Sequence, residues 1–153
     1  MDDGGRAPRI TVEAFNRLCS DSAPFLKIYN FVTEEIGYGR ARVRMPASAD
    51  HVRPGGTISG PAQMALADFT FYAALLGAIG EVPLAVTTSL NINFLRKPEP
   101  GELVADCRLL KLGKRLAVGD VSLYSNGLDA PVAHATATYS IPPDEGSAAL
   151  DPV

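Results

Sequence analysis

The residue with the clearest chemical potential in this chain is Asp68, the single charge within a long apolar stretch. The spacing of proline and glycine predicts a helix that begins at Pro61 and ends before Gly80. A carboxylate inside an apolar helix is costly unless it is hydrogen-bonded, paired or protonated. Asp68 is therefore either a functional carboxylate or a side chain that fills a solvated gap or satisfies neighbouring backbone.

The predicted helix is apolar nearly all round. Asp68 shares one face of the helical wheel with apolar residues, while Gln63 and Thr70 lie on the opposite side. The residues on the face of Asp68 are Pro61, Met64, Ala65, Phe71, Tyr72, Leu75 and Ile79. Such a helix is expected to be enclosed on most sides by its own protein or by a second subunit.

The segment 51–61, HVRPGGTISGP, followed by Leu66-Ala67-Asp68, resembles the signature of hotdog-fold acyl-CoA thioesterases of the phenylacetate-pathway (PaaI-like) type. Members of that family usually read His-x-Asn-x-x-Gly-x-x-His-Gly-Gly before a helix with an acidic residue. The similarity continues at 86–94, 98–101, 113–114 and 133–139. The resemblance implies an α+β hotdog fold, in which a curved antiparallel β-sheet wraps around one long central helix.

Three positions depart from the family motif. Arg53 stands where the family has Asn, Ser59 where it has His, and Pro61 where it has the second Gly. Asp68 and Gly60 are retained. The resemblance implies that Asp68 acts as nucleophile or as general base on water, and that the N–H of Gly60 polarises the thioester carbonyl.

Two further residues complete the expected catalytic group. Thr87 matches a family position that helps to place the attacking water, although a sheet-surface threonine explains it equally well. Arg53 is expected to replace the missing Asn as an orienting or charge-stabilising group, and a solvated loop arginine is the alternative. Lys114 and Arg115 resemble the basic turn that meets the phosphates of CoA in relatives, with ordinary exposed hairpin charges as the alternative.

Four more residues are expected to contact the substrate. Ser59 and His51 belong to the glycine-rich motif, and His51 could instead be satisfied by backbone. Met64 and Tyr72 stand beside Asp68 on the helix. Their apolar character suggests a pocket for aromatic or medium-length aliphatic acyl groups.

The elements that would position these residues are strands, then the long helix, then more strands. A short helix is predicted over 11–19 with Thr11 as its N-cap. Two strands, 25–32 and 39–45, are predicted around a turn at 33–37. Four more strands are predicted over 84–95, 102–110, 116–124 and 132–141, with turns at 112–114 and 126–127. Antiparallel strands with one dominant helix form an α+β domain.

Two predicted strands have a marked pattern of faces. In 84–95, strict alternation places one set of side chains on an apolar face and another on a polar face. The apolar set is Val86, Thr88, Leu90, Ile92 and Phe94, and the polar set is Thr87, Ser89, Asn91 and Asn93. In 39–45, the arginines at 40, 42 and 44 share one face, typical of a solvated sheet surface and alternatively of an interaction surface.

Length and charge are those of a single globular domain. The chain has 153 residues, 46% of them hydrophobic, and a net charge of −3. We expect one domain over 9–143 with flexible ends at 1–8 and 144–153. The net charge gives no indication of a basic surface that would bind nucleic acid. The central helix contains Asp, Gln and Thr, which makes it a poor membrane span.

The remaining motifs exclude several kinds of chemistry. Cys19 and Cys107 are far apart, and the N-terminus has no apolar signal region, so we expect a cytoplasmic protein with reduced thiols. His51 and His134 are isolated and form no metal-ligand pattern. A Gly-x-Ser-x-Gly elbow, a P-loop and a Rossmann glycine pattern are all missing from the sequence. We expect no metal and no cofactor, because coenzyme A would be part of the substrate.

The sequence therefore supports three hypotheses. The first is an acyl-CoA thioesterase. The second is a non-catalytic acyl-CoA-binding protein, motivated by the changes at Arg53, Ser59 and Pro61. The third is a hydratase or dehydratase, which is disfavoured because no histidine lies on the central helix. A sheet around one helix has open edges, so we expect a homodimer or a dimer of dimers.

Overall fold

A computed structural model describes residues 4–125 and 127–143 of the chain. Of the segments predicted as flexible ends, 144–153 and the first three residues lie outside the described residues. Residues 4–9 are exposed, and the Arg6 guanidinium stacks over the ring of Tyr38 at 5.1 Å from its centroid.

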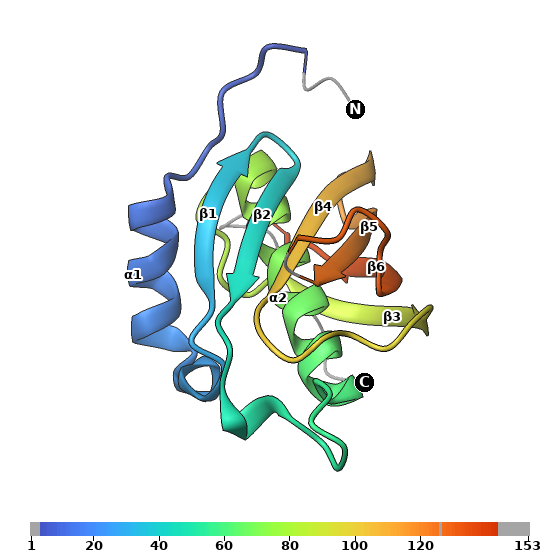
Figure 1. The fold of residues 1–153 in the computed structure, drawn as a ribbon. Helices are drawn as coiled ribbons and strands as arrows, with labels where there is room; N and C mark the ends of the chain where they lie inside the picture. The colour runs from blue at the N-terminus through green and yellow to red at the C-terminus, as the bar shows by residue number, and fades with distance from the viewer. Residues whose placement is uncertain (1–3, 126, 144–153) are drawn as a thin grey trace, which may run out of the picture.

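Six antiparallel strands form one sheet in the order β1-β2-β4-β5-β6-β3. The strands are β1 (Val32–Gly37), β2 (Arg40–Met45), β3 (Val86–Phe94), β4 (Leu103–Leu112), β5 (Leu116–Ser125) and β6 (Ala133–Ser140). All six contact the long helix α2 (Gly60–Ile79), around which the sheet curves (Figure 1). This arrangement confirms the predicted α+β hotdog fold.

Helix α2 begins and ends where the sequence predicts. The Ser59 side chain caps it by accepting a hydrogen bond from the N–H of Ala62, and Gly80 ends it at φ 85°, a conformation that favours glycine. The helix has the length and hydropathy of a membrane span. However, the sheet buries most of its residues, including Gln63 and Thr70 on the face opposite Asp68, as expected for the core helix of this fold.

The N-terminal elements differ in part from the prediction. Helix α1 (Val12–Ser22) forms with Thr11 as its N-cap, as predicted, and lies beside β1 (Figure 1). The predicted strand 25–32 is wrong, because Pro24–Ile28 is a 3-10 helix, η1, and Asn30 adopts φ 54°, which interrupts an extended chain.

The predicted turn at 33–37 is also wrong, since these residues belong to β1. In the structure, Glu34 pairs with Arg42 at 3.2 Å and Arg44 at 3.0 Å on the neighbouring strand. The chain turns at Tyr38-Gly39, where Gly39 has φ 71°. These ion pairs also account for two of the three arginines on the outer face of β2.

Candidate active site

Asp68 lies in the middle of α2, half-buried, and its side chain is held by two strands. Oδ1 accepts a hydrogen bond from the Thr87 hydroxyl of β3 at 2.6 Å and another from the Tyr139 hydroxyl of β6 at 2.8 Å. The Tyr139 hydroxyl also lies 3.1 Å from the backbone oxygen of Asp68. Within residues 4–125 and 127–143, no group donates to Oδ2. One carboxylate oxygen thus accepts two hydrogen bonds, and the other accepts none from the described residues.

A β-bulge in β3 brings Thr87 to Asp68. The register shifts between Thr87 and Ser89, opposite Tyr139 and Thr138 of β6. The bulge places Thr87 on the inner face together with Leu90, whose partner Ala137 is buried. Strict alternation, which put Thr87 on the face opposite Leu90, was therefore wrong here, and Val86 is 56% exposed rather than part of an inner face.

Tyr139 is a site residue that the sequence did not single out. Its ring is 3% exposed and stacks on Phe71 of α2, with centroids 4.6 Å apart. Burial, and then the negative charge of Asp68, raise the pKa of its hydroxyl well above the ordinary value of 10. Tyr139 therefore stays protonated and acts as a donor. The available signal in the sequence was a tyrosine at an inward-facing position of the last predicted strand, 132–141.

The N-terminus of α2 presents one free donor. Ser59 Oγ accepts from Ala62 N, the N–H of Gln63 bonds to the Ser59 carbonyl, and Pro61 has no N–H. In the described part of the chain, the N–H of Gly60 has no acceptor. Asp68 follows Gly60 by eight residues, so the two are about 12 Å apart along the helix axis. One chain therefore does not bring them to the same thioester.

The loop before α2 carries Arg53 on the surface. The N–H of Arg53 donates to Thr57 O at 2.9 Å, and Gly56 N donates to Arg53 O at 3.0 Å, which closes a tight turn. Gly55 and Gly56 have φ of 95° and 81°, values that glycine adopts without strain. Arg53 is exposed in this turn.

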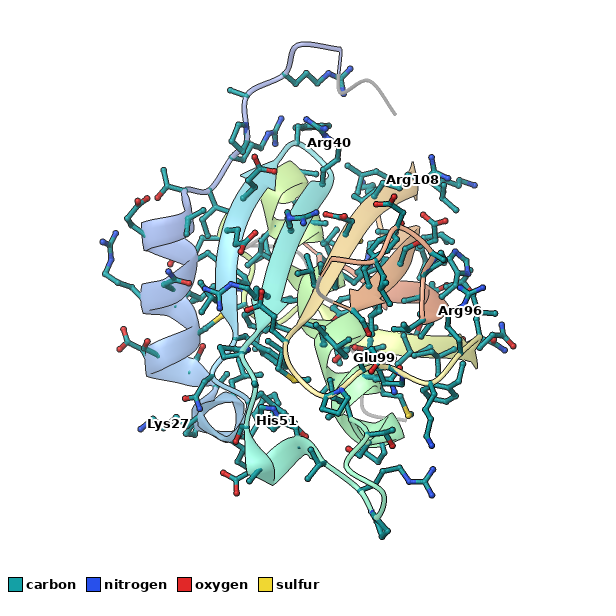
Figure 2. The ribbon with its side chains drawn as sticks, viewed as in Figure 1. Lys27, Arg40, His51, Arg96, Glu99 and Arg108 are labelled. Atoms are coloured by element: carbon teal, nitrogen blue, oxygen red, sulfur yellow. The ribbon has the colours of Figure 1, made fainter. Side chains whose placement is uncertain are left out.

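His51 connects this loop to η1 through hydrogen bonds. It is 3% exposed, and its Nε2 lies 3.0 Å from the carbonyl oxygen of Ile28 in η1. Figure 2 shows it at the same corner of the molecule as Lys27 of that helix. The His51 carbonyl accepts from Ser59 N at 2.8 Å, so His51 joins η1 to the start of α2. Its ring is held by backbone, the alternative given above.

Met64 and Tyr72 flank Asp68 on the most exposed side of α2. Met64 is 40% exposed, and the Tyr72 hydroxyl donates to Pro83 O at 3.1 Å. Burial raises the pKa of Tyr72 to about 12, with a smaller contribution from Cys19. Both side chains lie one helical turn from Asp68 on the same face of α2.

Lys114 and Arg115 lie far from Asp68, in the predicted hairpin between β4 and β5. Arg115 Nε donates to Ile141 O at 2.8 Å, while Lys114 lines a cavity of about 610 Å³ that also touches Ile79. Ile79 is eleven residues after Asp68 on α2, or about 16 Å along the axis. The structure therefore places the two basic residues at the opposite end of the helix from Gly60.

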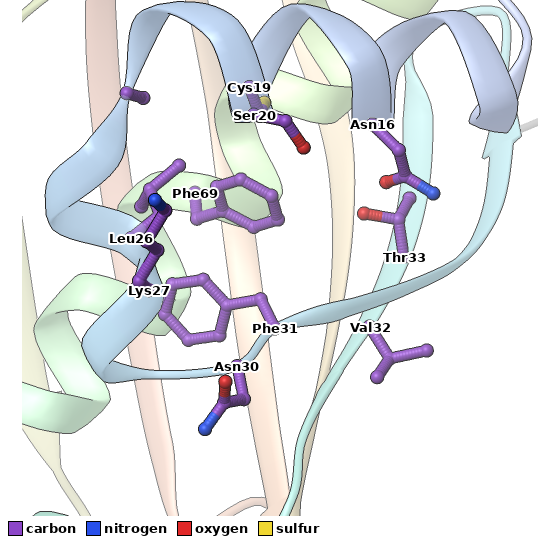
Figure 3. Close-up of a pocket in the computed structure, with 11 residues that line it drawn as sticks. Asn16, Cys19, Ser20, Leu26, Lys27, Asn30, Phe31, Val32, Thr33 and Phe69 are labelled. Carbon is purple, nitrogen blue, oxygen red and sulfur yellow. The ribbon is translucent and has the colours of Figure 1, made fainter.

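A second cavity, of about 410 Å³, lies between α1, η1 and β1. Figure 3 shows the rings of Phe31 and Phe69 together at its base, with centroids 4.8 Å apart, and Asn16 near Thr33 on the other side. Asp68 does not line this cavity, although Phe69 follows it in sequence. The cavity is thus separate from the carboxylate.

Comparison with known proteins identifies the family. The model of the thioesterase superfamily matches residues 55–132, so this chain belongs to the thioesterase superfamily and is a thioester hydrolase. A solved structure from Silicibacter sp. TM1040, named a putative thioesterase, is 42% identical, covers 91% of this chain and 96% of its own, and has a TM-score of 0.81.

Two other solved structures support the fold. A mutant of the phenylacetic acid degradation protein PaaI from Thermus thermophilus is 28% identical, covers 77% of this chain and 98% of its own, and has a TM-score of 0.68. A thioesterase from Haemophilus influenzae is 22% identical, covers 90% and 96%, and has a TM-score of 0.78, a likeness of fold alone. The PaaI-like resemblance seen in the sequence is confirmed.

Proposed function

We propose that this protein is an acyl-CoA thioesterase, which hydrolyses a thioester to a free acid and CoA. The observation that carries this proposal is the carboxylate of Asp68, half-buried on α2, with two donors on Oδ1 and none from the described residues on Oδ2. A carboxylate held in this way is oriented for reaction and keeps an oxygen free to react.

Two reaction routes fit this geometry. In the first, Asp68 accepts a proton from water as the water oxygen bonds to the thioester carbonyl carbon, and the C–S bond then breaks to release CoA thiolate, which takes that proton from Asp68. In the second, Asp68 itself bonds to that carbon, the thiolate leaves, and water hydrolyses the mixed anhydride. Both routes end with the acid, CoA and a regenerated carboxylate.

We propose that the site is completed between two copies of the chain. The free N–H of Gly60 would stabilise the oxyanion, yet it lies about 12 Å from Asp68 of its own chain. Among the described strands, β3 pairs only with β6, and Val86 and Phe94 leave about half of their surface exposed beside its open edge. A second copy packed on this edge would place Gly60 and Arg53 opposite Asp68.

We further propose how the substrate is held. Met64 and Tyr72 would contact the acyl group, and Lys114 and Arg115 would meet phosphates of CoA. Ser59 and His51 would contribute by holding the loop that carries Arg53, since both are engaged in hydrogen bonds there. We propose that the reaction needs no cofactor, because CoA is part of the substrate, and that it takes place in the cytoplasm.

One observation favours a second candidate, a non-catalytic acyl-CoA-binding protein. Ser59 replaces the family histidine, and its hydroxyl is used to cap α2, so it supplies no equivalent imidazole donor. In that case the pocket would be kept while turnover is lost.

Thiol release from a panel of short, medium, long-chain and aryl acyl-CoAs separates these candidates. We expect the wild type to hydrolyse part of the panel and Asp68→Asn to bind the same substrates without turnover. Acyl-CoA binding by the wild type with no hydrolysis anywhere in the panel would instead establish the binding protein.

A further inference from the structure

The contacts around Asp68 distinguish its two oxygens. Oδ1 accepts two short hydrogen bonds, from Thr87 and Tyr139, and Oδ2 accepts none from the described residues. Hydrogen bonds to an ionised oxygen are strong and lower its basicity. We infer that Tyr139 is a positioning residue which, with Thr87, holds Oδ1 of Asp68 and so presents Oδ2 as the oxygen that reacts. This inference rests on the proposed hydrolysis.

The side chain of Tyr139 is held in one position by its packing and its hydrogen bonds. Its ring is buried against Phe71 at 4.6 Å, nearly parallel at 15°. Its hydroxyl reaches both the side chain and the backbone oxygen of Asp68, so it is fixed relative to the helix turn that carries the carboxylate. It lies on β6, which is paired on both sides, by β5 and by β3.

Thr87 alone would hold the carboxylate less firmly. It comes from β3, the edge strand, at a bulge where the ladder is interrupted. Its hydroxyl reaches Oδ1 and its lone pairs remain able to accept from a water. Tyr139 has no comparable role in binding water, because its side chain is buried between the sheet and the helix. The two donors therefore have different parts: Tyr139 orients Asp68, and Thr87 links Asp68 to the solvent side.

The substitution Tyr139→Phe tests the inference directly, because it removes the hydroxyl and keeps the ring on Phe71. We expect kcat to fall about ten-fold with KM nearly unchanged, the scale of one hydrogen bond to a charged group. Thermal stability should change little.

Tyr124→Phe is the matched control, since Tyr124 lies on β5 on the outer face of the sheet and has no contact with Asp68. It should leave kcat and KM unchanged. The double variant of Tyr139→Phe with Thr87→Val should lose more activity than the product of the two single losses, because no donor then fixes Oδ1.

Two results would overturn the inference. One is a Tyr139→Phe enzyme with the wild-type kcat while Asp68→Asn is inactive. The other is a Tyr139→Phe enzyme that loses activity only in step with stability, since a packing role alone would give that pattern. If Asp68→Asn keeps its activity, the proposed function fails instead, and the two failures are thereby told apart.

Discussion

The chemistry of single residues in this protein depends on which backbone and side-chain groups already form hydrogen bonds and which do not. The Asp68 carboxylate has its donors on one oxygen, and the start of α2 has one uncommitted N–H among the described residues, at Gly60. These two features are complementary, because hydrolysis needs a base or nucleophile on one side of the carbonyl and an oxyanion donor on the other.

The Gly60 N–H can be removed without changing the helix. Proline is favoured at the first helical position, and Ser59 before it is already extended at ψ 151°, so Gly60→Pro should fold. We expect kcat to fall by about 10²-fold, as for loss of one oxyanion donor. Gly60→Ala keeps the N–H, and its Cβ would be at an acceptable 3.4 Å from Phe94, so it should retain most activity. Equal activity of the two variants would exclude the Gly60 N–H from the reaction.

Most of the candidate site could be predicted at this scale, and one residue could not. Asp68 and Gly60 stand out because helix spacing and the family motif are local in sequence. Tyr139 is 71 residues from Asp68 and has no local mark of its own. Thr87 was predicted by resemblance, but its inward direction depends on a bulge, which alternation cannot reveal.

At the scale of elements, α2 packs so closely on β1 that it needs a glycine. A Cβ at Gly77 would collide with the carbonyl oxygen of Gly37 and would lie 2.8 Å from Ile36 Cγ2. Helix propensity alone would make Gly77→Ala more stable by about 0.5–1 kcal/mol, whereas overpacking costs about 1–3 kcal/mol. We therefore expect net destabilisation of about 1–2 kcal/mol in urea unfolding. A more stable variant would show that the helix and strand separate easily.

The outer face of the sheet holds a pH-sensitive group. Asp120 of β5 accepts from Arg108 Nε and His134 Nε2, each at 3.1 Å. Burial alone would raise the pKa of Asp120, but hydrogen bonds and charges from His134 and Arg108 outweigh it and hold the pKa below its ordinary 3.8. The stabilisation is thus present above pH 3.8 and is lost as the pH falls through the lowered value.

Asp120→Asn should therefore cost about 0.5–1 kcal/mol of unfolding free energy at pH 7, a modest value because solvent screens the pair. The cost should shrink as the pH falls below 3.8. Urea unfolding at several pH values measures it, with Asp129→Asn in an exposed loop as the control. A cost that is the same at all pH values would mean that the carboxylate charge is not what stabilises these strands.

The segment between α1 and α2 shows the limit of prediction for elements. Phe25 and Ile28 are apolar and suggested a strand, yet they are 65% and 59% exposed on η1. Conversely, Glu34 falls in the predicted turn at 33–37 but lies in β1, where Arg42 and Arg44 on the next strand pair with it. The second error comes from partners on another strand, whereas the first comes from the local backbone, where Asn30 adopts φ 54°. The long helix and the later hairpins were predicted because their signals are local.

At the scale of the whole molecule, membership of the family accounts for the fold. The open edge of β3 is the basis of the dimer that we propose. The thioesterase-superfamily match and the wrapped helix agree with the sequence motif at 51–68. The motif predicted the fold well because it includes the turn, the cap and the helix that the sheet encloses. From the sequence we could predict a dimer but not the surface that forms it, since that surface depends on which side chains of β3 are exposed.

A charge on the β3 edge should break the proposed dimer. Val86→Lys places a lysine on an exposed edge position, a device that blocks strand pairing. We expect light scattering to show a monomer and thiol release to be lost with it. Leu116→Lys is the matched control, because Leu116 is 54% exposed and lies on β5, which is paired on both sides. A monomeric wild type with full activity would contradict assembly of the site from two chains.

The central claim is that the Asp68 carboxylate performs the hydrolysis, and one comparison tests it most directly. Thiol release from the best acyl-CoA of the panel is measured for wild type, Asp68→Asn and the exposed control Asp129→Asn. The amide keeps the size of the side chain and removes its basicity, so kcat should fall by at least about 10³-fold in Asp68→Asn and stay at the wild-type value in the control. An Asp68→Asn enzyme as active as the wild type would contradict the account.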